Sequence, residues 1–387
     1  MLTKKLNKHS INKNSPMNLK IAVLSGDGIG PEVILQAKKA LYAIAVVYDH
    51  EFVFEDALIG AYAIEKTGNP LPEQTLNLCL NTDAVLMGAI GDIKYDNNSN
   101  TKLRPIEGLL RLRQALGLYA NIRPIKPYKD LLDLSPLKRK IIEDTDFVIF
   151  REISGGSYFT EKKINEQGTV ASDLCEYTED EIIRITHLAF KTAQKRRNKV
   201  TLVDKANILQ TSKLWRKIVT EISDSYPEVE TEFLFVDDAA MKIIINPKQF
   251  DVILTENLFG DILSDEASVI TGAIGLLPSA SLGNSTALFK PIHGSFSEAK
   301  TKNIANPIAS ILSAAMLLEH FGLHLESEKL YEAVDKAIEL NVVTADLNPY
   351  SKFGTNEVGD FISNFILSKD DLYFKSDNVY IGQSTIV

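Results

Sequence analysis

Short apolar segments alternate with longer helical stretches along this chain, and this alternation constrains the fold more than any other feature. The apolar segments are short enough to be buried strands. They lie at 20–24, 84–87, 146–150, 200–203 and 251–254. Helical stretches stand between or after them at 33–41, 178–195, 211–223 and 306–321. Strands that alternate with helices predict an α/β fold with a largely parallel sheet.

Length, charge and cysteine content narrow the class of protein. A chain of 387 residues suggests two domains, and a net charge of −9 argues against a nucleic-acid or anionic-membrane partner. Two cysteines, Cys79 and Cys175, are too few for a disulfide framework and fit a reducing cytoplasm. No apolar run is long enough to span a membrane. Residues 1–18 are rich in Lys, Asn and Ser, and we expect a disordered tail there.

A glycine-rich loop follows the first strand. Gly26, Gly28 and Gly30 are spaced as in the start of a dinucleotide fingerprint, but Pro31 stands where the third glycine of that motif belongs. The sequence therefore predicts no Rossmann site. The loop still precedes a helix N-terminus, so it can line a cofactor cleft.

Two aspartates stand four residues apart in a segment with helical periodicity. Asp261 and Asp265 would share one helix face, where like charges repel by a few tenths of a kcal/mol. A divalent cation such as Mg²⁺ or Mn²⁺ would remove that cost, because it prefers carboxylate oxygens. A solvated acidic face is the alternative for such a pair taken alone. Asp237, which follows an apolar pair, is a third candidate ligand.

Three arginines could meet at one edge of the sheet. Arg113 and Arg123 lie in one short segment, and each alone would be read as a surface residue. Arg151 directly follows the apolar run 147–150, and the ends of strands are where open α/β sheets bind their ligands. Because a guanidinium group grips a carboxylate bidentately, the three indicate a substrate with more than one carboxylate.

Two further side chains are candidates for acid–base chemistry. Lys205 follows the strand at 200–203, and a lysine near a cation or in a closed cleft can act as a base. Tyr158 lies in the segment 155–176, where strand-like pieces at 157–160 and 169–172 predict a hairpin arm that pairs with a second subunit. Its phenol is either an acid or a packing group.

Several segments together resemble the isocitrate/isopropylmalate dehydrogenase family of β-decarboxylating dehydrogenases, from about residue 19 to near the C-terminus. The motifs are GDGIGPE (26–32), RLRQALGLYANIRP (111–124), FREISGGSYF (150–159), VDKANIL (203–209), NLFGDILSDEAS (257–268), GLLPSASLG (275–283) and HGS…IANP (293–307). The resemblance implies a non-Rossmann fold, a homodimer with shared active sites, and oxidative decarboxylation of a 2-hydroxy-3-carboxy acid by NAD⁺ with Mg²⁺ or Mn²⁺. It also implies residues 19–118 and 272–387 as a cofactor-binding domain and 119–271 as a substrate and dimerisation domain with the arm.

The resemblance assigns roles to individual residues. Asp261 and Asp265 would bind the metal, joined by Asp237 from the partner subunit, which also contacts the substrate. The three arginines would hold the substrate carboxylates. Lys205 would help to remove the hydroxyl proton across the dimer, and Tyr158 would protonate carbon after CO₂ leaves. The cofactor-binding residues implied are Ile29, Gly275, Ser279, His293, Gly294, Glu298 and Asn306.

The sequence departs from the family pattern at two of these places. Ile106 stands where the family usually has Glu, and Glu298 stands where it usually has Asp. We expect Leu109, Leu110 and Ile208 to form an apolar wall, which favours a substrate with an apolar branch. Within the family, the resemblance then implies the member of leucine biosynthesis and not one that acts on isocitrate, homoisocitrate or tartrate. A catalytically silent regulatory subunit is the alternative of a different class.

Overall fold

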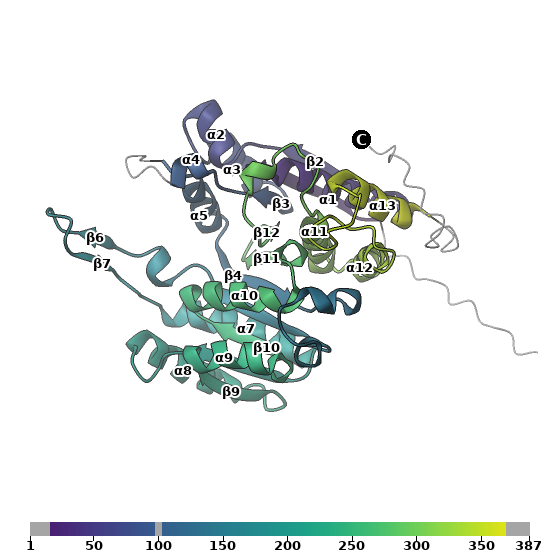
Figure 1. Ribbon diagram of the computed structural model, residues 1–387. Coiled ribbons are helices and arrows are strands. Elements are labelled where there is room, and N and C mark those ends of the chain that lie inside the picture. The colour runs from purple at the N-terminus through teal and green to yellow at the C-terminus, as the bar shows by residue number, and fades with distance from the viewer. Residues whose placement is uncertain (1–15, 97–102, 369–387) are drawn as a thin grey trace, which may run out of the picture.

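The computed structural model describes residues 16–96 and 103–368 (Figure 1). The tail expected at 1–18 lies outside the described residues except for its last three. Those three are ordered, which corrects the expected boundary: Asn18 begins the first strand, and the Met17 N–H donates to Nδ1 of His50 at 3.1 Å.

A sheet of ten strands runs through the described part of the chain and confirms the predicted fold class. Its order is β2 (Glu51–Asp56), β1 (Asn18–Gly26), β3 (Ala84–Ala89), β12 (Ala287–Pro291), β11 (Pro278–Gly283), β4 (Leu118–Ile125), β5 (Phe147–Glu152), β10 (Val252–Thr255), β8 (Lys199–Asp204) and β9 (Glu230–Phe235). The first four and the last four of these strands are parallel within each group, whereas β11 and β4 run antiparallel to their neighbours. Two parallel halves therefore meet in an antiparallel centre.

Helices cover both faces of this sheet, and inner parallel strands such as β3 and β10 are buried along their whole length. The half formed by β2, β1, β3 and β12 carries α1 (Gly30–Tyr48), α2 (Gly60–Thr67), α3 (Glu73–Leu80), α4 (Ile93–Asp96), α5 (Pro105–Ala115), α11 (Ile308–His320), α12 (His324–Glu339) and α13 (Thr355–Leu367). The other half carries α6 (Arg139–Ile142), α7 (Glu179–Gln194), α8 (Gln210–Ser223), α9 (Val236–Ile245) and α10 (Asn257–Thr271). Among the described residues, no helix is both long and apolar enough to cross a membrane.

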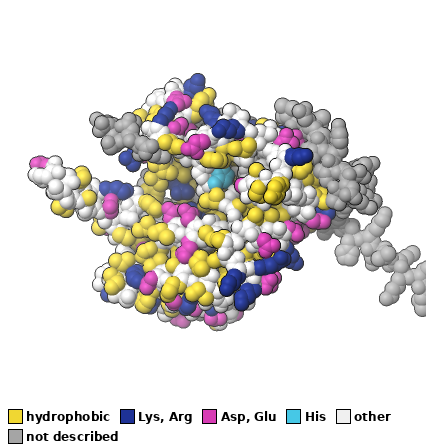
Figure 2. All heavy atoms as spheres, viewed as in Figure 1, with side chains coloured by type: hydrophobic (Ala, Val, Ile, Leu, Met, Phe, Trp, Pro, Cys, Tyr) yellow, Lys and Arg dark blue, Asp and Glu magenta, His cyan; other side chains and the backbone are white. Residues whose placement is uncertain are grey.

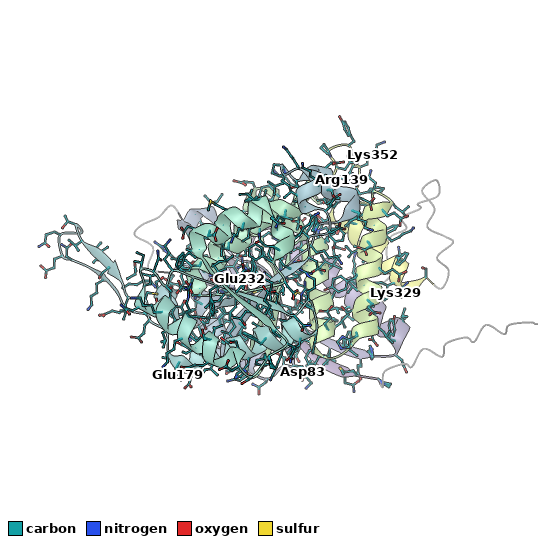
Figure 3. All side chains as sticks on the ribbon, turned by 90° about the horizontal axis from the view of Figure 1, so that it is seen from below. Asp83, Arg139, Glu179, Glu232, Lys329 and Lys352 are labelled. Carbon is teal, nitrogen blue, oxygen red and sulfur yellow. The ribbon has the colours of Figure 1, made fainter. Side chains whose placement is uncertain are left out.

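The segment 155–176 is the predicted hairpin arm, and it extends away from the body of the molecule (Figures 1 and 3). Its strands are β6 (Lys162–Ile164) and β7 (Ala171–Asp173). The strand expected at 157–160 is wrong, because the chain forms a 3₁₀ turn at Gly156–Tyr158 there. Gly156 starts this turn with φ +74°, a conformation that favours glycine.

Helix α10 brings the two aspartates to the centre of the molecule. It begins directly after β10 and ends at Gly272, whose φ of 80° stops the helix. Leu263 and Ala267 pack into a hydrophobic cluster with Phe147 and other residues of the sheet. This packing seats the helix on β4 and β5, so its polar side chains lie against the antiparallel centre.

Candidate functional site

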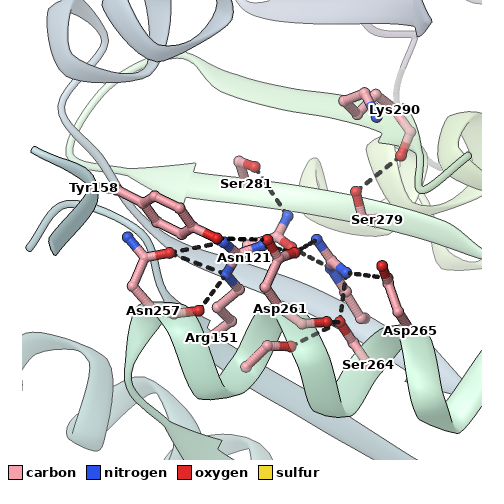
Figure 4. Close-up of polar contacts among 12 residues, drawn as sticks. Asn121, Arg151, Tyr158, Asn257, Asp261, Ser264, Asp265, Ser279, Ser281 and Lys290 are labelled. Atoms are coloured by element: carbon pink, nitrogen blue, oxygen red, sulfur yellow. Dashed lines mark hydrogen bonds and ion pairs between the residues drawn. The ribbon is translucent and has the colours of Figure 1, made fainter. Parts of the chain in front are cut away.

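Asp261 is the centre of a polar cluster that joins α10 to the sheet (Figure 4). Its Oδ1 accepts hydrogen bonds from Nη1 of Arg151 and, at 3.3 Å, from Nη2 of Arg123. Its Oδ2 accepts one from the hydroxyl of Tyr158 at 2.9 Å. Arg123 also donates to Asp265 at 3.3 Å. The structure thus brings together five of the residues that the sequence singled out.

Strand register explains why these groups share one face. Asn121 on β4 stands opposite Arg151 on β5 and opposite Ser281 on β11. Arg123 lies two residues further along β4, and side chains at i and i+2 point to the same face of a sheet. The Arg123 Nε donates to Oδ1 of Asn121 at 2.7 Å, and Asn121 donates to Oγ of Ser281 at 3.1 Å. These bonds hold the guanidinium group in place.

Arg151 is also held by hydrogen bonds, in its case to the first residue of α10. Its Nε donates to the backbone carbonyl of Asn257 at 2.8 Å, and its Nη2 donates to Oδ1 of the same residue at 2.7 Å. The Asn257 amide in turn donates to the carbonyl of Gly155 at 3.0 Å. The first residue of α10 therefore connects the arginine to the base of the arm, where Tyr158 lies.

Arg113 differs from the other two arginines because it has no partner. It comes from α5, its Nε is buried, and it makes no hydrogen bond or ion pair with any residue that the structure describes. Burial, reinforced by the charges of Arg151 and Arg123, lowers the pKa of Arg113 to about 9. The guanidinium group remains charged at neutral pH and is available to an anion.

The electrostatics of the cluster separate an acid from a base. Burial opposes ionisation of Asp261, but Arg151 and Arg123 outweigh it and lower the pKa of this carboxyl group. Burial and the neighbouring Asp261 raise the pKa of Tyr158 above its usual value of 10. Asp261 is therefore a carboxylate at neutral pH, and Tyr158 is a phenol that can donate a proton.

Asp237 and Lys205 lie apart from this cluster and pair with each other. Asp237 is in the first turn of α9, and Lys205 directly follows β8. Within the described ranges, no group of three His, Cys, Asp or Glu side chains is placed to hold a metal ion. Asp261 and Asp265 still fit a hard divalent cation, because their carboxylates lie one turn apart and that of Asp265 is 63% exposed.

Most of the residues expected at a cofactor lie on loops near β11 and β12, and Ser279 lies on β11 itself. The Ile29 N–H donates to the carbonyl of Ser295 at 2.8 Å, which joins the glycine-rich loop to the segment that contains His293, Gly294 and the exposed Glu298. A Cβ atom on Gly275 would lie 3.1 Å from the side chain of Asn306, so these two positions also adjoin. The Ser279 hydroxyl donates to the carbonyl of Lys290 at 2.9 Å.

His293 combines burial with an unused hydrogen-bonding atom. Its Nε2 is buried and has no partner among the described residues, whereas its Nδ1 bonds the carbonyl of Gly294 at 2.9 Å. Burial lowers the pKa of His293 to about 4, so the ring is neutral. Figure 2 shows acidic and basic side chains in the hollow between the two halves of the molecule.

The residues expected to form an apolar wall differ in exposure. Leu109 is 4% exposed and packs in the hydrophobic core beneath α5, so its side chain is not open to a ligand. Leu110 is partly exposed, and Ile208 is 66% exposed on the loop after β8. Ile106 is 46% exposed at the start of α5. Of the two leucines, Leu110 is therefore the better candidate for contact with a ligand.

Sequence reasoning missed five polar residues of this region. Asn121, Ser281, Asn257, Ser264 and Lys290 either bond the arginines or lie on the same face. Ser264 accepts a hydrogen bond from Nη1 of Arg123. Asn121 could have been found from its spacing, since it stands two residues before Arg123 on a strand. The others depend on strand and helix contacts between distant segments.

The fold and this cluster of charged side chains at its antiparallel centre define an α/β enzyme. A sequence model of the family described as isocitrate/isopropylmalate dehydrogenase matches residues 20–362. The chain belongs to this family.

Individual relatives agree with this assignment. The chain is 50% identical over 352 residues to a 3-isopropylmalate dehydrogenase of Bacteroides fragilis, covering 90% of this chain and 99% of the relative. It is 47% identical over 363 residues to that of Aquifex aeolicus, covering 92% and 99%. Among solved structures, an isocitrate dehydrogenase from Methylococcus capsulatus is similar with a TM-score of 0.82 and 35% identity, covering 90% of this chain and all of that one.

Gly260 offers a test of the site geometry. A Cβ atom there would lie 2.6 Å from Cγ of Arg151, so alanine must displace this arginine even though it is the better helix former. We expect Gly260→Ala to weaken binding of a dicarboxylate by roughly tenfold or more. Titration calorimetry would measure this. Ser268→Ala on the exposed side of the same helix is the control, and equal binding by both variants would contradict the geometry.

Proposed function

We propose that this protein catalyses the NAD- and divalent-metal-dependent oxidative decarboxylation of 3-isopropylmalate to 2-oxoisocaproate, a step of leucine biosynthesis. One observation carries the proposal: the paired carboxylates of α10 and three arginines from separate elements converge in one cleft with a phenol. The curated relatives named 3-isopropylmalate dehydrogenase support the substrate. The two free cysteines are in keeping with a cytoplasmic enzyme.

The arginines account for binding and orientation. Arg113 is free to bind an anion, and Arg123 and Arg151, held by Asn121 and Asn257, can bind a substrate carboxylate once a cation neutralises Asp261. When bound, NAD⁺ and Mg²⁺ or Mn²⁺ would supply a hydride acceptor and a Lewis acid at the substrate oxygens. Asp261 and Asp265 would hold the metal, with Asp237 from a second subunit. Ile29, Gly275, Ser279, His293, Gly294, Glu298 and Asn306 would hold the cofactor.

Two side chains would move protons. Lys205 takes the proton of the substrate hydroxyl as hydride leaves C2, which produces a β-keto acid. Loss of CO₂ from this acid leaves an enolate, and Tyr158 protonates its carbon. The raised pKa of Tyr158 keeps the proton on the phenol until that step.

A homodimer would complete the site. Lys205 and Asp237 lie apart from Asp261 in one chain, so a shared site needs them from a partner. Exposed apolar side chains on α9 and α10 offer a surface for that contact: Met241, Ile245, Leu258 and Ile262 are 43 to 67% exposed. The arm at 155–176 would pair with its counterpart. In this arrangement 19–118 and 272–387 form the cofactor-binding domain, and 119–271 the substrate and dimerisation domain.

The metal site should depend on the acid pair. We expect Asp265→Asn to keep the fold but to raise the metal concentration needed for activity by roughly tenfold or more. Activity against Mn²⁺ concentration, with Mn²⁺ binding measured separately, gives the result. Glu266→Gln, the adjacent acid, should leave the metal requirement as in the wild type. The same requirement in all three proteins would make Asp265 an ordinary surface acid.

Lys205 and Tyr158 should act in different steps. We expect Lys205→Met to slow hydride transfer ~10²-fold or more, because a positioned base is lost. Tyr158→Phe should slow the later protonation instead. Substrate deuterated at C2 distinguishes the two: the isotope effect on turnover should grow in the first variant and shrink in the second. Normal turnover in both would favour the silent regulatory subunit.

Substrate choice should rest on apolar contact at C3. Burying the three carbons of an isopropyl group stabilises the bound substrate by roughly 2.4 kcal/mol, at about 0.8 kcal/mol per carbon. The kcat/KM for 3-isopropylmalate should therefore exceed that for malate by about 60-fold. The kcat/KM for isocitrate should be lower still, because its third carboxylate would be desolvated against a leucine. We expect Leu110→Ala to lower the ratio of kcat/KM for 3-isopropylmalate to kcat/KM for malate. The test is kcat/KM of wild type and variant on all three acids, and a wild-type preference for isocitrate would overturn the proposed substrate.

A further inference from the structure

Lys290 is a fourth cation on the same face of the sheet as the arginines. It lies on β12 opposite Ser279 of β11, and Ser281, two residues on, stands opposite Asn121. Because side chains two residues apart share a face, the register places Lys290 on the face of Arg123. Two strand spacings of about 4.8 Å separate the two positions, which long side chains can bridge. Figure 4 shows Lys290 on the strand beside Ser279, above the cluster, with Ser279 between the two.

No carboxylate neutralises this lysine within the described part of the chain. The Nζ of Lys290 donates a hydrogen bond to the backbone carbonyl of Pro291, and it forms no ion pair with any described residue. By contrast Lys199, a partly buried lysine of β8, pairs with Glu230 and Glu232 on the adjacent strand. Lys290 thus differs from Lys199 in having no acid partner among the described residues.

The surroundings of Lys290 are unfavourable to a lone positive charge. Burial, reinforced by Arg113 and Arg123, lowers its pKa to about 7. Asp261 and Asp265 act on it only from a distance, and the adjacent His293 is neutral. Arg113, the charge that acts most strongly on Lys290, is itself without a partner. Two buried cations that repel each other form a site for an anion that can contact both.

We propose that Lys290 and Arg113 together bind one carboxylate of the substrate, gripping it from the β12 and α5 sides. This inference rests on the proposed function, in which the ligand is a 2-hydroxy-3-carboxy acid. The carboxylate relieves the repulsion between the two cations and brings each of them a charge-assisted hydrogen bond. Lys290 is then a binding residue that no residue pattern in the sequence indicated.

Binding of 3-isopropylmalate in the presence of Mg²⁺ and without cofactor tests the proposal. We expect Lys290→Met to raise the Kd by at least about tenfold, because a hydrogen bond to a charged group is lost. Lys290→Arg should restore most of the affinity. Lys199→Met is the matched control and should bind as the wild type does. The Kd of NAD⁺ alone should not change in the Lys290 variants.

A double-variant cycle and thermal unfolding sharpen the test. If both cations grip one carboxylate, Lys290→Met should cost less in an Arg113→Met background than in the wild type. The unliganded Lys290→Met protein should melt at the same or a higher temperature, because an uncompensated charge has been removed. An unchanged Kd for 3-isopropylmalate in Lys290→Met would overturn the proposal. A loss of affinity confined to NAD⁺ or to isocitrate would also overturn it, as would strictly additive effects of Lys290→Met and Arg113→Met on the binding free energy.

These outcomes separate the inference from the proposed function. If the wild type binds 3-isopropylmalate through Lys290 but does not turn it over, the proposed activity is wrong and the proposed binding site stands. If the wild type turns it over and Lys290→Met binds it equally well, only the proposed role of Lys290 is wrong.

Discussion

The ion-pair network of Arg151, Asp261 and Arg123 is the interaction on which the centre of this molecule depends. The two arginines are 4% and 8% exposed, so their charges could not remain in place without the carboxylate of α10 and the amides and hydroxyls around it. The network ties α10 to β4 and β5. It also fixes the distance between the acids that would hold a metal and the arginines that would hold a substrate.

The antiparallel centre of the sheet makes this network possible. In the parallel halves, side chains on both faces are covered by helices and are largely apolar. At β11, β4 and β5 the strands reverse direction, and polar residues from three strands come into one row through Ser281, Asn121 and Arg151. The loops proposed to hold the cofactor and α5 with Arg113 belong to one half of the sheet, whereas Arg123 and Arg151 lie on β4 and β5 at its antiparallel centre, so the two proposed binding regions adjoin there.

Positive charge exceeds negative charge in this cleft. Arg123 and Arg151 are paired with aspartates, whereas Arg113 and Lys290 have no acid within the described residues. This imbalance costs stability in the empty protein, and an anionic ligand would reduce it. The neutral His293 beside Lys290 marks the boundary between the charged part of the cleft and the part expected to hold the cofactor.

The sequence by itself determined the elements and the chemistry that local patterns encode. The alternation of apolar and helical segments predicted the α/β fold, and the spacing of Asp261 and Asp265 predicted two acids on one helix face. Only the tertiary structure decided which distant residues meet. Strand register placed Lys290 on the same face as Arg123, and core packing buried Leu109. The ends of β8 and β9 lie side by side, which pairs Lys205 with Asp237 outside the hydrogen-bond network of Asp261. Periodicity cannot reveal these facts, because they depend on contacts between segments far apart in the chain.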